Sequence, residues 1–102
     1  LLWDNLLTIK RTLEQGGVRL IMLNYPRSDI DQCGQAPRDV IARFARAQSL
    51  PLLDIGKVLG PQLMGSNMRY YAKVDGHPNS DGYQRIALTL HERLVALGWL
   101  VQ

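Results

Sequence analysis

The chain has 102 residues, a length that suits one small domain or part of a larger one. Its 12 basic and 9 acidic residues give a net charge of +3 and are scattered along the sequence, which argues against nucleic-acid binding. The single cysteine, Cys33, excludes an internal disulfide and a zinc site of several thiolates, and no apolar run approaches the roughly 18 residues that span a bilayer.

An amphipathic helix and a buried strand are expected first. Residues 2–15 place leucine and isoleucine at helical spacing, and Gly16 and Gly17 end that helix. The nearly continuous apolar run 18–23 predicts a strand that is buried on both faces, as in a parallel sheet.

A second helix and a second strand complete a βαβ unit. After a loop over 27–36, a helix is expected from about 37 to 48, with Pro37 in its first turn. Residues 51–55 predict another short strand. Strand, helix and strand in this order indicate a right-handed parallel crossover.

The last part of the chain is expected to hold a short helix over 57–64, a loop or short extended piece over 65–74, and a long helix over 81–97. Asn79 or Ser80 is placed to cap that long helix, because a short polar side chain accepts from the first free N–H groups. Its expected buried stripe comprises Tyr83, Ile86, Ala87, Leu90, Leu94 and Leu97.

These elements form an incomplete sheet. A strand that is apolar on both faces normally has a neighbour on each side, and only 51–55 is available to pair with 18–23. An open edge would remain. Further strands are therefore expected from an absent N-terminal half of the same domain or from another chain.

The strongest chemical signal is Asp75-Gly76-His77-Pro78-Asn79. In a serine hydrolase the imidazole accepts the nucleophile's proton, and a carboxylate holds the ring in the correct tautomer. Side chains two residues apart on an extended backbone point the same way, so Asp75 can reach His77. Pro78 restricts the backbone of His77 to extended conformations.

This pattern, with the following Gly-Tyr and apolar terminal helix, resembles the last conserved block of the SGNH or GDSL hydrolases. The order of elements is also similar to the second half of their flavodoxin-like sandwich. The resemblance implies that His77 is the catalytic base and Asp75 its partner. It implies no organic cofactor and no metal.

Two features depart from the family pattern. Its members more often place the acid three residues before the histidine, whereas Asp75 lies two before His77. The family's nucleophile motif Gly-Asp-Ser and its oxyanion motif Gly-x-Asn-Asp are both missing from the chain. Without these groups, the chain alone is expected to be inactive.

The other candidate side chains have ordinary structural explanations as turn or solvent-facing serines, a surface histidine, packed aromatic rings and a loop cysteine. Ser28 and Ser66 each remain open as a substrate contact, and Tyr70 and Tyr71 remain open as residues that line a cleft. A metal site would have to use Asp75, His77, Asp81 and His91, which have no recognised spacing. The side chains with ordinary explanations are Ser28, Ser66, His91, Tyr70, Tyr71 and Cys33.

The sequence thus predicts an α/β chain, residues 1–102, that is a single domain or the C-terminal part of one SGNH-hydrolase-like domain. The expected activity of the whole protein is hydrolysis of a small-molecule, lipid or carbohydrate ester, or acyl transfer from it, through a serine acyl-enzyme. Two alternatives stay open: a non-catalytic α/β binding or structural module, and an independent domain that pairs with a second copy. The compartment stays open, periplasmic or secreted locations included.

Overall fold

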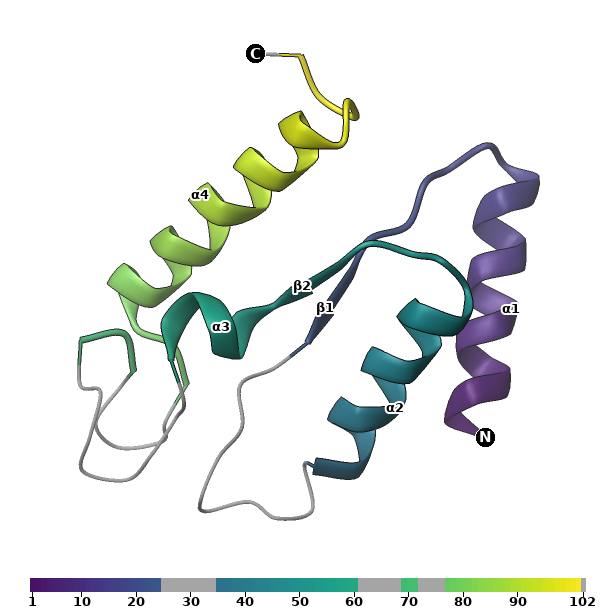
Figure 1. Cartoon of the computed structure of the whole chain (residues 1–102), viewed down its shortest axis with the longest axis horizontal. Coiled ribbons are helices and arrows are strands. Elements are labelled where there is room, and N and C mark those ends of the chain that lie inside the picture. Colours follow the sequence, from purple (N-terminus) through teal and green to yellow (C-terminus); the bar gives the residue numbers. More distant parts are fainter. Residues whose placement is uncertain (25–34, 61–68, 72–76, 102) are drawn as a thin grey trace.

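The computed structural model describes residues 1–24, 35–60, 69–71 and 77–101. These parts of the chain hold four helices and two strands, which are labelled in Figure 1. The element bounds are α1 (Leu2–Gln15), β1 (Met22–Asn24), α2 (Gln35–Ala47), β2 (Leu52–Asp54), α3 (Ile55–Leu59) and α4 (Ser80–Ala96).

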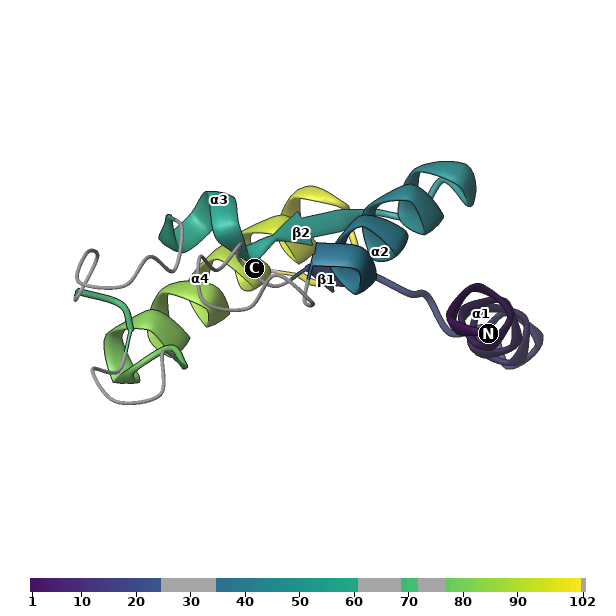
Figure 2. The same ribbon diagram turned by 90° about the horizontal axis from the view of Figure 1, so that it is seen from below.

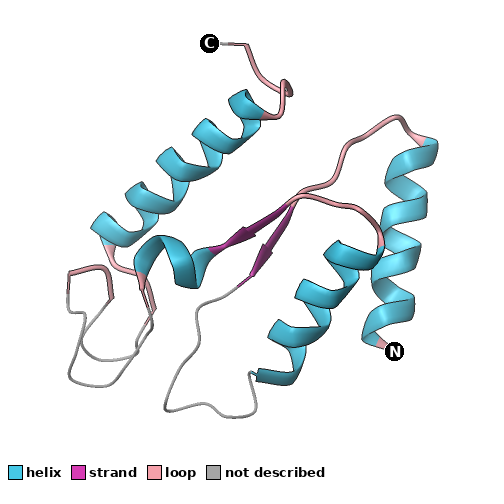
Figure 3. Ribbon diagram, in the orientation of Figure 1, coloured by secondary structure: helices cyan, strands magenta, loops and turns pink. Residues whose placement is uncertain are grey.

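The two strands are parallel, and the helix between them completes the expected βαβ unit. Met22 pairs with Leu52, and Asn24 pairs with Asp54. In Figure 1, α1 and α2 lie on one side of the strands, and α3 and α4 lie on the other. Figure 3 shows the same helix, strand and helix layers by colour. The expected α/β class is therefore confirmed.

Alternation along the strands directs side chains into two small clusters. Met22 packs with the buried Phe44 and Ala45 of α2, and α1 covers this cluster with Trp3, whose ring lies 5.1 Å from that of Phe44, edge to face. Leu53 of β2 lies on the opposite face of the sheet and belongs to a second cluster. That cluster comprises Leu53, Ile55, Leu59 and Tyr71, with Ile86 and Leu90 of α4 packed against it.

The prediction of a strand over 18–23, buried on both faces, is wrong. Only residues 22–24 pair, because β2 offers a three-residue partner on one side. Val18 is 52% exposed and Leu23 is 38% exposed. Apolar composition alone does not make a strand, since strand length is set by the hydrogen-bonding neighbours that are present.

Three other predicted bounds need correction. The second helix begins two residues early, at Gln35, and the second strand is shorter than 51–55. The helix predicted over 57–64 instead begins at Ile55, because the Asp54 carboxylate accepts from the N–H of Gly56 and caps it. It ends at Leu59, before Gly60 adopts a φ of 82°.

Helix α4 confirms the predicted cap but only part of the predicted stripe. Asn79 caps the helix, which begins at Ser80. Ile86 and Leu90 pack against the core. Tyr83 is 56% exposed, and Ala87 and Leu97 are also exposed, so the expected burial of these three side chains is wrong. The apolar side chains of α4 outnumber those that the two-stranded sheet can cover.

The molecule is a thin slab, with extents of 44 × 38 × 18 Å. Figure 2 shows it turned by 90°, with α1 at one end. Its radius of gyration is 15.0 Å, whereas a compact domain of about 100 residues has about 13 Å. None of the described helices has the length and apolar character needed to cross a membrane.

Candidate functional site

His77 lies three residues before Ser80, the first residue of α4, on a segment that is paired with an earlier part of the chain. Pro78 is buried and forms an isolated antiparallel bridge with Tyr71. His77 itself is exposed. The buried proline thus fixes the backbone beside the imidazole while the ring stays accessible to solvent.

Asn79 makes three hydrogen bonds, and two of them join the His77 segment to residues 69–70. Its side-chain oxygen accepts from the Gly82 N–H at 2.8 Å, which caps α4. Its Nδ2 donates to the Arg69 carbonyl at 2.9 Å. Its backbone N–H donates to the Tyr70 carbonyl at 2.8 Å. We call these three bonds, with the Tyr71–Pro78 bridge, the Asn79 clasp.

Gly82 allows the clasp to close. A Cβ atom at this position would lie 2.3 Å from the Tyr70 carbonyl oxygen and 3.1 Å from the Pro78 Cβ. Real Cβ atoms do not approach a backbone oxygen so closely. Glycine is therefore required because the 69–70 backbone crosses directly over the first turn of α4.

Tyr71 anchors the same segment to α3. Its ring is 4% exposed within the second cluster, and its hydroxyl donates to the Gly60 carbonyl at 2.7 Å. Burial raises the pKa of the Tyr71 hydroxyl above its ordinary value of 10.0. The expected aromatic packing of Tyr71 is confirmed, and Tyr70 is half-buried beside it.

A second polar group lies where the two strands end. The Arg38 guanidinium donates to the Asp54 carboxylate at 3.4 Å, and the same carboxylate caps α3. Asn24, opposite Asp54 in register, is 2% exposed. Its side-chain oxygen has no hydrogen-bond partner among the described residues. Parallel sheets bind ligands at this carboxyl end.

The sequence interpretation missed Asn24 and the link from Asn79 to Arg69. In the sequence, Asn24 directly follows the apolar run 18–23. A single polar residue after an apolar run carries no signal for burial, because burial depends on which distant elements pack around the strand. The Asn79–Arg69 bond spans ten residues and follows from no local spacing.

Several predicted site residues lie outside the described residues. They include Asp75, the expected acid, so the expected approach of Asp75 to His77 stays a prediction. Within the described ranges, no group of three or more histidine, cysteine, aspartate or glutamate side chains comes together to hold a metal ion. The other candidates outside the described ranges are Ser28, Ser66 and Cys33.

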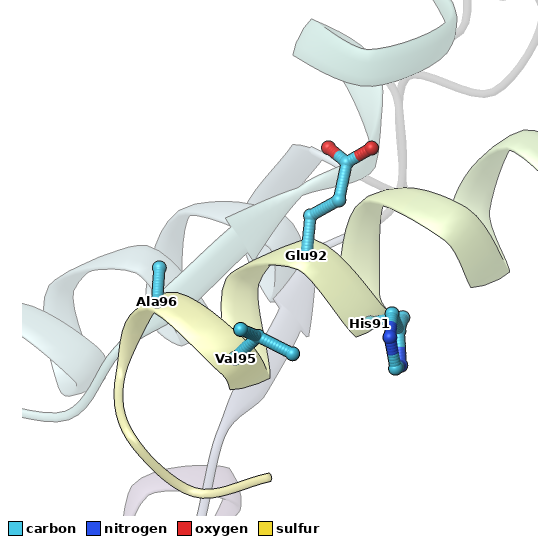
Figure 4. Close-up of a pocket in the computed structure, with 4 residues that line it drawn as sticks. All are labelled: His91, Glu92, Val95 and Ala96. Atoms are coloured by element: carbon cyan, nitrogen blue, oxygen red, sulfur yellow. The ribbon is translucent and has the colours of Figure 1, made fainter. Parts of the chain in front are cut away.

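His91 is exposed, as expected for a surface histidine, and borders a shallow hollow along the end of α4. Figure 4 shows His91, Glu92, Val95 and Ala96 around it. His91 lies fourteen positions after His77 along mostly helical chain, which corresponds to about 20 Å at 1.5 Å per residue. The hollow is therefore distinct from the His77 segment.

No protein-family profile matches the chain, and neither does any curated protein. The structure of a GDSL-like lipase from Bacteroides thetaiotaomicron VPI-5482 is similar to it, with a TM-score of 0.70 and 17% sequence identity. The alignment covers 93% of this chain and 51% of the lipase, so the chain spans about half the length of that protein. In fold, therefore, the chain is similar to part of a GDSL-like lipase.

Proposed function

We propose that the chain is the C-terminal part of a serine ester hydrolase and that His77 is its general base. The observation that carries this proposal is the exposed imidazole on an anchored turn, in a chain whose fold is similar to that of part of a GDSL-like lipase. Asp75 orients the ring. The substrate is an ester of a small molecule, a lipid or a carbohydrate.

The proposed reaction has two steps. A serine hydroxyl attacks the ester carbonyl and gives its proton to His77, which passes it to the departing alcohol as the acyl-enzyme forms. Water then attacks the acyl-enzyme, with His77 taking the water's proton and returning it to the serine as the acid leaves. The Asp75 carboxylate stabilises the imidazolium present during each transfer.

The serine and the oxyanion donors would come from a preceding part of the same domain. Leu23 is exposed on β1, and the only described strand paired with β1 is β2. The radius of gyration exceeds that of a compact domain of this size, and the similar lipase is about twice as long. A neighbouring strand would pair with β1, and Asn24 Oδ1 would accept a donor there.

Fluorophosphonate labelling tests the proposal. The reagent modifies serines that a neighbouring base activates, so we expect labelling of the complete protein and none of residues 1–102 alone. Labelling of the short chain would place the nucleophile within it. A complete, folded protein that resists labelling and has no esterase activity would favour the alternative, a non-catalytic α/β binding or structural module.

A further inference from the structure

Asn79 makes a contact that a helix cap does not require. An N-cap needs only a side-chain acceptor, which serine or aspartate also provides. Asn79 uses its oxygen for this purpose, on the Gly82 N–H. Its Nδ2 group points the other way, to the Arg69 carbonyl at 2.9 Å. Among common cap residues, only asparagine has both a side-chain acceptor and an amide donor.

The second contact fixes the segment that carries His77. The backbone N–H of Asn79 reaches the Tyr70 carbonyl, and Pro78 bridges Tyr71. The Tyr71 hydroxyl continues the connection to Gly60, at the end of α3. Residues 77–79 are therefore attached both to α4 and to the sheet through α3, and Asn79 is the residue at which the two attachments meet.

We propose that Asn79 is a positioning residue for the His77 imidazole, acting through its bond to the Arg69 carbonyl. This inference depends on the proposed function, because it assigns a task only if His77 accepts a proton. A general base must lie about 2.6–3.2 Å from the group that it deprotonates. A displacement of about 1 Å can lower the rate by about 10².

The decisive variant is Asn79→Ser in the complete protein. Serine keeps the cap acceptor but is too short to donate to the Arg69 carbonyl. We expect kcat to fall roughly 10- to 100-fold while KM stays within about twofold, because the base is misplaced but the substrate pocket is intact. Ser80→Ala, which changes the neighbouring exposed residue at the start of α4, is the matched control and should keep wild-type kcat.

A spectroscopic measurement separates positioning from stability. In wild type the His77 ring proton signals should be single and sharp, and in Asn79→Ser they should broaden or double as the ring samples several positions. His91, exposed on a later turn of α4, is the internal reference and should not change. Asn79→Asp, which also keeps the acceptor and loses the donor, should reproduce both effects.

Two results would overturn the inference while leaving the proposed function in place. They are an Asn79→Ser enzyme with kcat within twofold of wild type, and an unchanged His77 signal, each with His77→Ala inactive. A fully active His77→Ala enzyme would instead remove the proposed function, and Asn79 would then have no catalytic group to position.

Discussion

The backbone carbonyl oxygen of Tyr70 lies 2.3 Å from the point where a Cβ atom of Gly82 would stand. No rotamer change relieves such a contact, because the helix backbone fixes the position of the Cβ atom and the oxygen belongs to the Tyr70 backbone. The first turn of α4 and the segment before it must separate to admit any side chain.

Gly82→Ala should therefore destabilise the complete protein by about 1–3 kcal/mol, the usual range for overpacking. Alanine is otherwise more favourable than glycine inside a helix by about 0.5–1 kcal/mol. The clash with the Tyr70 carbonyl should outweigh that gain. Urea unfolding monitored by circular dichroism measures it. Gly16→Ala is the control, since a Cβ there meets nothing closer than 3.6 Å. Equal stability of Gly82→Ala and wild type would contradict the close approach.

His77→Ala should lower kcat/KM of the complete protein by a factor of about 10²–10⁴, the usual contribution of a general base. The melting temperature should barely change, because the side chain is exposed. Ester hydrolysis with purified variants measures the effect, and His91→Ala should retain full activity. An unaltered rate in His77→Ala would exclude the imidazole from the reaction. Asp75→Asn should give a smaller loss.

Tyr71 should make the protein lose stability in alkali. Burial raises its pKa in the folded state, so the unfolded chain ionises first. The contribution of Tyr71 to the unfolding free energy is then fully present below pH 10.0 and is lost as the pH rises from there through the higher folded pKa. Urea midpoints between about pH 8 and 12 measure this fall, which Tyr71→Phe should reduce.

Tyr83→Phe is the matched control, because Tyr83 is 56% exposed and its removal should leave the alkaline fall unchanged. An identical pH dependence in Tyr71→Phe and wild type would mean that the Tyr71 hydroxyl is not buried. Below pH 10.0, Tyr71→Phe should cost about 1 kcal/mol, because the Gly60 carbonyl loses its donor.

Leu90 is the best point at which to test the packing of α4 on the sheet. It is half-buried against Leu53, Ile55, Leu59 and Tyr71. Leu90→Ala should cost about 2 kcal/mol, the low end for leucine truncation, since burial is partial. Leu88→Ala, at a 51% exposed position, should change the unfolding free energy by less than about 0.5 kcal/mol. Equal effects would mean that α4 presents another face.

Local signals in the sequence were sufficient for the ends of α1 and for the start of α4. The bounds of α1 follow from its apolar spacing and from the glycines after Gln15. The α4 cap follows from Asn79. Both depend on contacts within four residues along the chain, which residue type and spacing encode.

Long-range contacts determined what the sequence interpretation missed. Strand β1 is short because its length depends on β2, thirty residues away. Tyr83 is exposed because the faces of α4 that become covered depend on which elements surround it. The clasp requires residues 69–71 to return across α4. Glycine is needed at position 82 because of that crossing, and the residues next to Gly82 in the sequence do not indicate it.

Asp54 is the last residue of β2 and the N-cap of α3, and its carboxylate also pairs with Arg38 of α2. From there, α3 leads to Gly60, which receives the Tyr71 hydroxyl. The five residues of α3 therefore act as a spacer between the sheet and the turn that bears His77. One added residue would rotate the Gly60 carbonyl by about 100° around the helix axis. Tyr71 would then lose its acceptor. We therefore expect insertions and deletions among natural variants to fall in loops and not within α3.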